Sequence, residues 1–290
     1  MLTVSLGLLA ALGFGAADFA GGMGTKRLHA LAVTGSVAIV GLVVLVTVST
    51  LSQDTWSVES AFWGGLSGLT GLAAIALLYA CLARGPMSIL SPTTALLSAL
   101  IPMLWGFATG SQLSFWVYPA LGLALVAVVL VGFVPDDSAV RPTAQALLMA
   151  IGSGLLIGLF YIFIDLAPAE SGMTPLVANR MVQTTVVGLI VAVFIATRGW
   201  RRLIKPGTES VMSWRRLWGL MIVGGVLDAL SNVAVLTGFR LGEMSIVAVL
   251  TALYPAGTIL LAWIVLREPL QRIQWVGLGL ALIASMLLAL

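Results

Sequence analysis

Charged side chains are scarce in this sequence, and their scarcity excludes a soluble protein. Only 9% of the 290 residues are charged, whereas 60% are hydrophobic. A soluble domain carries roughly a quarter charged residues. So little charge cannot cover the surface of a water-soluble fold of this length, which places the chain in a lipid bilayer.

Cysteine and histidine are almost absent. Cys81 and His29 are single occurrences, which excludes disulfide frameworks, zinc sites of the usual ligand types and histidine-based nucleophilic triads. The net charge of +3 lies in loops, without a basic groove lined by aromatics, so a nucleic-acid partner is not expected. A Gly-x-x-x-x-Gly-Lys-Ser/Thr motif is also missing, which excludes ATP as the energy source within this chain. We therefore expect no enzyme, no cofactor and no metal.

Long apolar runs predict an all-α integral membrane protein. A transmembrane helix needs about 20 mostly apolar residues. The first run lacks a basic segment before it, so we interpret it as a retained helix and not as a signal peptide. The sequence predicts ten spans, near residues 3–22, 31–51, 60–82, 88–108, 115–134, 144–166, 174–197, 215–238, 245–266 and 273–290.

The second half of the chain repeats the first. Residues 85–130 align without a gap on 242–287, with identities that include Met87 and Met244, Thr94 and Thr251, and the block Leu-Gly-Leu-Ala-Leu at 121–125 and 278–282. Internal repeats in a multi-span chain are typical of transporters. The interpretation is a first repeat at 1–134, a linker at 135–143 and a second repeat at 144–290. Each repeat has five spans, and an odd number predicts that the two insert with opposite orientation.

Basic residues predict the orientation, because short cytoplasmic loops are enriched in Lys and Arg. The even-numbered loops hold only Arg240. The odd-numbered loops and their flanks hold Lys26, Arg27, Arg84, Arg141, Arg198, Arg201, Arg202, Lys205, Arg215, Arg216, Arg267 and Arg272. We therefore expect odd loops in the cytoplasm, both termini outside, and residence in the cytoplasmic (plasma) membrane.

Asp228 is the most informative ionisable residue, because it lies at the middle of the eighth span with Asn232 one turn later. Charges inside a bilayer are costly and usually functional. Residues at i and i+4 share a helix face, so this polar stripe is expected to face a protein-lined cavity. Desolvation penalises the charged carboxylate, which predicts a proton-binding role. The alternative is a buried structural hydrogen bond to a neighbouring helix.

Two further aspartates occupy matching positions near the ends of spans 1 and 6. Aligning Gly7 on Gly154 places Asp18 on Asp165. In an inverted repeat one carboxylate would lie near each mouth, where it could serve a gate. The alternative is that both are helix-end residues that reach into the headgroups.

Asn179 and Arg180, early in span 7, are further candidates. Arg180 could reach the outer interface, pair with Asp165, or bind the carboxylate of a substrate. Aromatic side chains inside spans are candidates for the cavity wall, namely Tyr79, Tyr161, Tyr254, Trp105 and Trp263. Pro92, Pro102 and Pro255 interrupt the hydrogen bonds of spans 4 and 9, which frees carbonyls that a ligand pathway could use.

Several of these segments resemble a known family. The stretch from Gly242 through Ser245, Leu253 and Pro255, then Leu266-Arg267-Glu268-Pro269-Leu270 and the glycine-led final span, resembles the second EamA domain of the drug/metabolite transporter superfamily. The opening segment 13–22 is similar to the start of one bacterial branch of it. The resemblance implies a monomeric, ten-helix inverted-repeat secondary transporter, with a cavity framed by spans 1, 3, 4, 6, 8 and 9. Better-known members are described with cytoplasmic termini, which differs from the orientation that the charges predict here.

The predicted function is secondary active transport of a small polar or amphipathic organic metabolite by alternating access. An amine fits a cavity with more acids than bases, and an amino-acid-like zwitterion fits if Arg180 also faces inward. Coupling to protons is an open alternative, and the expected partners are the substrate, H⁺ and membrane lipid. Two other classes remain, a passive channel or facilitator and a membrane-embedded lipid enzyme, for which the chain lacks a catalytic constellation.

Overall fold

The computed structural model describes residues 1–82, 84, 87–110, 113–132, 142–204, 213–267 and 269–289. Residues 135–141 of the expected linker, and Glu268 of the family-like loop, lie outside the described residues. Within them the chain is helical, and the one β-type pairing is an isolated bridge between Leu28 and Ile204. The helices are α1 (Leu2–Thr25), α2 (Ala30–Leu51), α3 (Val58–Leu82), α4 (Met87–Ala108), α5 (Val117–Gly132), α6 (Ala144–Asp165), η1 (Ala169–Ser171), α7 (Thr174–Arg198), η2 (Trp200–Leu203), α8 (Trp214–Leu241), α9 (Met244–Thr251), α10 (Tyr254–Leu261), η3 (Ala262–Leu266) and α11 (Arg272–Ala289).

The helices match the expected spans closely. In the described part of the chain, nine segments are long and apolar enough to cross a membrane, and α5 is a shorter apolar helix of 16 residues. At 1.5 Å per residue α5 is about 24 Å long, somewhat less than the hydrocarbon core of about 30 Å. The all-α, multi-pass class predicted from hydropathy is confirmed.

The ninth span is broken, which the sequence indicated through Pro255. It runs from Met244 to Leu266 as α9, α10 and the π-helical η3, with an interruption at Ala252 and Leu253. Pro92 and Pro102, in contrast, lie inside an α4 that continues through both. The proline at the start of α10 has no N–H to donate, so the break leaves no donor unsatisfied at that position.

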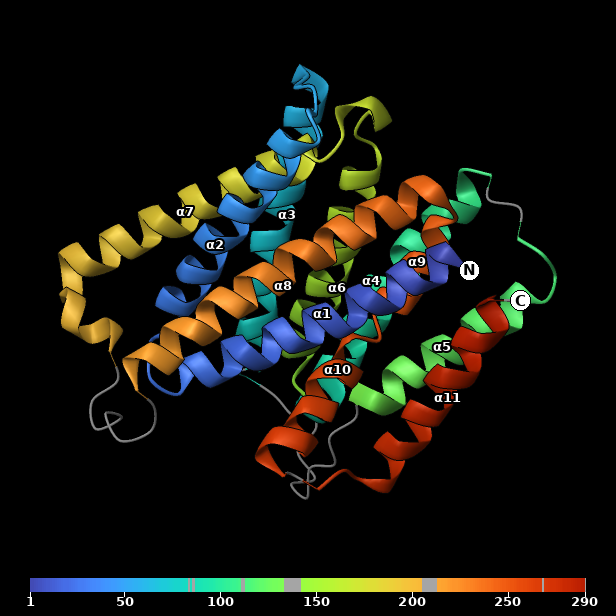
Figure 1. Cartoon of the computed structure of the whole chain (residues 1–290). Coiled ribbons are helices and arrows are strands. Elements are labelled where there is room, and N and C mark those ends of the chain that lie inside the picture. Colours follow the sequence, from blue (N-terminus) through green and yellow to red (C-terminus); the bar gives the residue numbers. More distant parts are fainter. Residues whose placement is uncertain are drawn as a thin grey trace.

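Most of the closely packed helix pairs join one helix of the first half of the chain to one helix of the second half (Figure 1). The pair α1 and α8 corresponds to the pair α6 and α3. In the same way, α2 on α8 corresponds to α7 on α3, and α1 on the broken ninth span corresponds to α6 on α4. Three further pairs join equivalent spans, α5 with α11, α2 with α7 and α4 with α9. Each of the contacts named here therefore has a counterpart in which the two halves of the chain exchange roles.

Close contacts between helices rest on glycine. In α1, Gly15 lies so near α10 that a Cβ there would be 2.7 Å from the Gly257 Cα and 2.7 Å from the Thr258 N. The Thr258 hydroxyl donates to the Gly15 carbonyl at 3.1 Å. In α3, a Cβ on Gly68 would be 2.7 Å from the Asn179 carbonyl oxygen. Small residues at such positions let membrane helices approach backbone to backbone.

Gly15→Ala is expected to lower the free energy of unfolding by about 1–3 kcal/mol, the usual range for overpacking. The added methyl meets backbone atoms of α10, which cannot rotate away. The measurement is thermal unfolding in detergent, with Gly279→Ala as the matched control, because nothing lies within 4 Å of a Cβ there. Equal unfolding midpoints for the two variants would contradict the close approach.

The chain's connections divide between two ends of the bundle (Figure 1). At one end the Asp54 carboxylate accepts from the Met173 N–H at 2.7 Å, which joins the connection 52–57 to the connection 166–173. Both termini lie at this end, which we call the terminal end. At the other end, the loop end, the His29 N–H donates to the Leu203 carbonyl at 2.7 Å and Arg27 lies 4.0 Å over the Trp214 ring.

Acidic and basic side chains are divided between the same two ends of the bundle. Among the described residues, the terminal end carries Arg240 against Asp54, Glu59, Asp165, Glu170 and Glu243. The loop end carries Lys26, Arg27, Arg84, Arg198, Arg201, Arg202, Arg215, Arg216, Arg267 and Arg272. The fold thus gathers at one end the basic residues that the loop count assigned to one side.

Cys81 is fully buried near the loop end of α3. It packs with Leu90, Ala146 and Ala150 where α3, α4 and α6 meet, and its thiol donates to the Leu78 carbonyl at 3.0 Å.

Candidate substrate site

Asp18 and Asp228 lie at the same depth in the bundle. α1 runs antiparallel to α8, since Gly13 contacts Ser231 and Gly24 contacts Met221. Between these contacts Asp18 is level with the segment 224–228, and the charges of the two carboxylates act on one another. The expectation that Asp18 lies at a mouth is therefore corrected, because α1 continues to Thr25 and leaves Asp18 two turns inside it.

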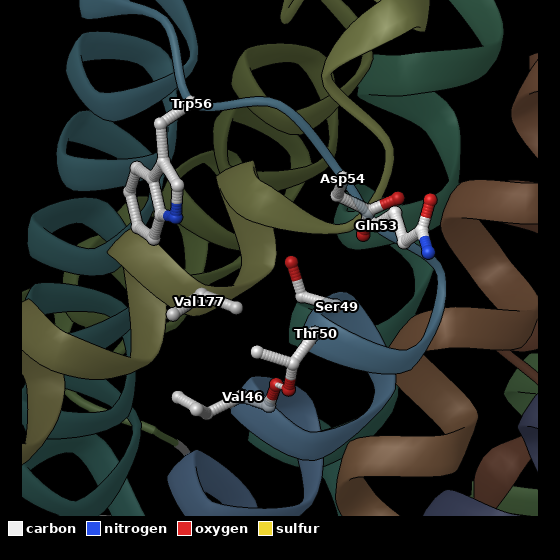
Figure 2. A pocket seen from close by; sticks show the side chains of 7 residues that line it. All are labelled: Val46, Ser49, Thr50, Gln53, Asp54, Trp56 and Val177. Carbon is white, nitrogen blue, oxygen red and sulfur yellow. Dashed lines mark hydrogen bonds between the residues drawn. The ribbon is translucent and has the colours of Figure 1, made fainter.

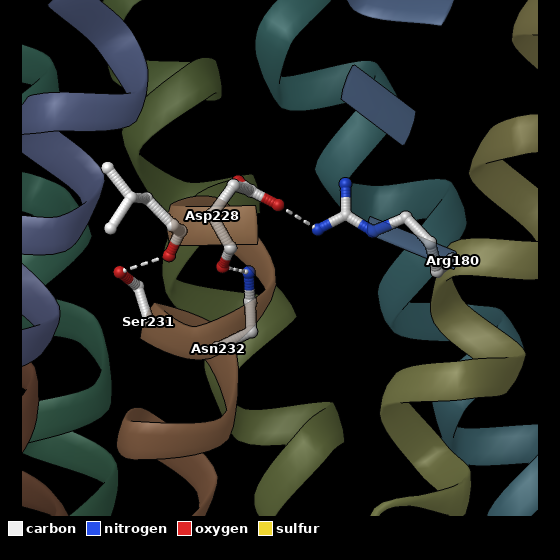
Figure 3. Close-up of polar contacts among 5 residues, drawn as sticks. Arg180, Asp228, Ser231 and Asn232 are labelled. Carbon is white, nitrogen blue, oxygen red and sulfur yellow. Dashed lines mark hydrogen bonds and ion pairs between the residues drawn. The ribbon is translucent and has the colours of Figure 1, made fainter. Parts of the chain in front are cut away.

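Asp228 is held in an ion pair with Arg180. Figure 3 shows the Arg180 guanidinium of α7 donating through Nη2 to Oδ2 of Asp228 in α8. The Arg180 side chain is 9% exposed and that of Asp228 is 22% exposed. The guanidinium crosses α2 at Gly41, where a Cβ would lie 3.4 Å from Nε. Nε itself is buried and has no hydrogen-bond partner among the described residues.

This pair corrects the alternative in which Arg180 meets Asp165. Asp165 is the last residue of α6, at the terminal end, and the charged group that acts on it is Arg240. Arg240 donates to the Pro168 carbonyl at 3.3 Å and is also within electrostatic range of Asp54 and Glu170. Spacing along the chain could not separate these choices, because each depends on which helices are neighbours.

Asn232 and Asn179 are both engaged in structural hydrogen bonds. The Asn232 amide donates to the Asp228 carbonyl oxygen at 2.8 Å, one turn back in the same helix (Figure 3). The Asn179 amide donates to the Ser67 hydroxyl of α3 at 2.7 Å. Ser67, a fully buried partner that links α3 to α7, was not singled out from the sequence, since a serine in a glycine-rich helix carries no distinctive pattern.

Asp18 differs from Asp228, because it makes no ion pair or hydrogen bond within the described part of the chain. Its side chain is exposed, yet the groups that its charge reaches come from other helices. They are Tyr79 of α3, Tyr161 of α6 and Tyr254 at the start of α10. The Asp18 carboxylate is therefore within electrostatic range of three helices besides its own.

Three tyrosines that the sequence nominated are thus within electrostatic range of Asp18, and one of them, Tyr161, is also within range of Asp228. Tyr161 is 9% exposed and packs edge to face on Phe239, whereas Tyr79 is 58% exposed. Trp263 lies in η3 and stacks edge to face on Trp275 at 5.4 Å. Trp105 is 37% exposed near the end of α4, and no ring contact joins it to the described aromatic residues around Asp18.

The charged groups at this depth define what the site can bind. Two carboxylates, Asp18 and Asp228, and one guanidinium, that of Arg180, give the site a formal charge of −1. No cluster of three or more Asp, Glu, His or Cys side chains suited to a metal occurs among the described residues. We call Asp18, Asp228, Arg180, Tyr79, Tyr161 and Tyr254 the central site.

Comparison with known proteins identifies the family of the chain. The model of the EamA-like transporter family matches residues 144–290. The chain belongs to this family. The resemblance noted in the sequence is thereby confirmed, and the protein is a multi-pass membrane protein of a transporter family.

Among solved structures, 29 chains match. One, titled only as the crystal structure of a protein, superposes with a TM-score of 0.72 at 15% identity, over 99% of this chain and 98% of that chain. At that identity the likeness supports the fold alone. A search of curated proteins finds no match.

Proposed function

We propose that this EamA-like protein is a secondary active transporter of a small organic amine, with alternating access and proton coupling, and that Asp18 is the group on which amine and proton compete. The observation that carries the proposal is the difference between the two carboxylates. Asp228 is neutralised by Arg180, whereas Asp18 makes no ion pair in the described part of the chain. A carboxylate at mid-depth without a counter-ion is costly, so it binds either a proton or a cationic substrate.

Competition for one carboxylate is sufficient for coupling. If proton and amine exclude one another at Asp18, the release of one is required before the other binds. Cation exchange across the membrane follows when the site opens to each side in turn. Tyr79 and Tyr254 supply rings and hydroxyls beside the carboxylate, and aromatic faces attract ammonium groups.

The paired contacts of the helices support an inverted repeat. Two equivalent sets of helices, related by a pseudo-two-fold axis in the membrane plane, can form the same site from either side. In our proposal the loop end is cytoplasmic and both termini are outside the plasma membrane, which follows the asymmetry of Lys and Arg.

A zwitterionic substrate is the second candidate, and one observation favours it. The Arg180 Nε is a buried donor without a partner among the described residues, and buried donors normally bond. A substrate carboxylate that bonds there would place its ammonium group toward Asp18. A passive channel is distinguished by flux that does not saturate.

The test is uptake of radiolabelled amines and amino acids into proteoliposomes, with and without a pH gradient, because exchange of one proton for one monovalent amine moves no net charge. We expect saturable amine uptake whose direction reverses with the gradient. Uptake of amino acids alone would favour the zwitterion. An absence of gradient-driven uptake together with failure of tracer counterflow would overturn transport.

A further inference from the structure

A cavity opens at the terminal end of the molecule, and none of its lining residues belongs to the central site. It has a volume of about 290 Å³ and is lined by Val46, Ser49, Thr50, Gln53, Asp54, Trp56 and Val177. Figure 2 shows these side chains around one space, with Trp56 on one side, Asp54 and Gln53 on another, and Ser49 and Thr50 at the end of α2. The volume is close to the lower bound for small-molecule sites.

The polar groups of this outer cavity are oxygen-rich and carry negative charge only. Asp54 contributes a carboxylate, Ser49 and Thr50 contribute hydroxyls, and Gln53 contributes an amide. No lining residue is basic. The Asp54 Oδ2 accepts from the Met173 N–H, and an ionised carboxylate keeps further acceptor positions. This set suits a ligand that is positively charged and donates hydrogen bonds.

Trp56 adds a face for the cation. Its side chain is 55% exposed, so neighbouring side chains do not cover the whole indole ring. An ammonium group over an indole gains electrostatic attraction from the ring, and Asp54 on the other side of the space supplies the opposing charge. Val46 and Val177 provide an apolar wall for the carbon part of the ligand.

The electrostatic field at this end favours cations over lipid phosphate. Five acidic residues and one arginine are described there, and that arginine, Arg240, already lies among Asp54, Asp165 and Glu170. A lipid headgroup would bring a phosphate into a negative region, whereas a free amine is drawn in.

The cavity lies in line with the central site along two helices. Val177 is one turn before Arg180 in α7, and Ser49 is two turns beyond Gly41 in α2, the residue that Arg180 crosses. Val177 is 2% exposed and packs with Leu45, so these side chains separate the cavity from the ion pair.

We propose that this outer cavity is a second binding site for small organic ammonium ions, held by Asp54 and Trp56, separate from the central site. It deepens the proposed function by adding a place where the amine is captured at the terminal end. The binding itself does not depend on transport, so the two ideas fail separately.

The experiment measures binding of benzylammonium by isothermal titration calorimetry to the full chain in dodecyl maltoside micelles, whose headgroups carry no ammonium group. Benzyl alcohol is the neutral control. Asp18→Asn removes the charge of the central site and leaves the outer cavity intact. In this background Asp54→Asn keeps the acceptor for the Met173 N–H, and Trp56→Ala truncates an exposed side chain, so both variants are expected to fold. Glu59→Gln and Trp116→Ala are matched controls at the same end, and both residues are exposed.

We expect two sites in the unmodified chain and one in Asp18→Asn. The remaining affinity should fall about tenfold with Asp54→Asn and about tenfold with Trp56→Ala, and less than about twofold with the controls. Retained binding in Asp18→Asn, together with no amine uptake by the unmodified chain, would support the outer site and reject the proposed transport.

Three outcomes would overturn the outer site. Loss of all binding in Asp18→Asn assigns the ligand to the central site alone. Equal binding of benzyl alcohol shows an apolar cavity without cation selectivity. Binding in Asp18→Asn that neither Asp54→Asn nor Trp56→Ala weakens shows that the ligand lies elsewhere.

Discussion

Arg180→Ala is expected to lower the free energy of unfolding by about 3 kcal/mol, the largest loss of stability among the variants considered. Removal of one partner of a buried ion pair leaves the other charge uncompensated, which costs about 3–5 kcal/mol in proteins. Asp228 is 22% exposed on its side chain, so the lower part of that range applies. Thermal unfolding in detergent, followed by far-UV circular dichroism, should show a midpoint lower by roughly 6 °C.

The double variant Arg180→Met with Asp228→Asn separates the pair from its parts. Neither charge then remains, and buried pairs replaced by neutral groups are often of similar stability. We expect most of the lost stability to return. Arg240→Ala is the control, because this arginine is half-buried at the terminal end. A double variant as unstable as Arg180→Ala would show that the guanidinium stabilises the bundle by packing and not by its charge.

Asp18→Asn is expected to reduce amine uptake about 100-fold without loss of folding. Removal of a charge that pairs with a ligand costs about 2–5 kcal/mol of binding, and each 1.4 kcal/mol is tenfold. Asparagine resembles the protonated carboxyl in size and polarity, so the fold is retained while amine and proton both lose their site. Uptake of a radiolabelled amine into proteoliposomes measures the effect directly.

The pH response gives Asp18→Asn its specificity. If Asp18 binds the proton, the residual uptake of the variant should be independent of the pH gradient, whereas Asp18→Glu should keep a pH-dependent uptake of reduced rate. Glu170→Gln, an exposed acid at the terminal end, should leave both unchanged. A normal pH response in Asp18→Asn would remove this residue from the coupling step.

The spans could be predicted from the sequence because each depends on a local property, a long apolar run. The end residues of α2, α4 and α6 differ from expectation by one residue or none. Prolines were less decisive. Pro92 and Pro102 stay within a continuous helix and Pro255 follows a break, since the outcome of a proline depends on which neighbours replace the lost hydrogen bonds.

The residues of the central site could be predicted from the sequence, but the contacts between them could not. Asp18, Asp228 and Arg180 stand out as charges inside apolar runs, but their pairing depends on α7 reaching α8 across α2 at Gly41. A glycine among 32 gives no sign of that crossing. The outer cavity escaped the sequence for a similar reason, because Gln53, Asp54 and Trp56 lie in a connection without periodicity and their partner Val177 lies far along the chain.

Cys81 leaves the folded protein without an exposed native thiol among the described residues. It is the one thiol of the sequence, and it is shielded where α3, α4 and α6 meet. A cysteine introduced on either end of the bundle is then the sole thiol within reach of a reagent in the folded protein. Membrane-impermeant maleimides can therefore assign each end to a side of the membrane in intact cells, with the native sequence as its own unlabelled background.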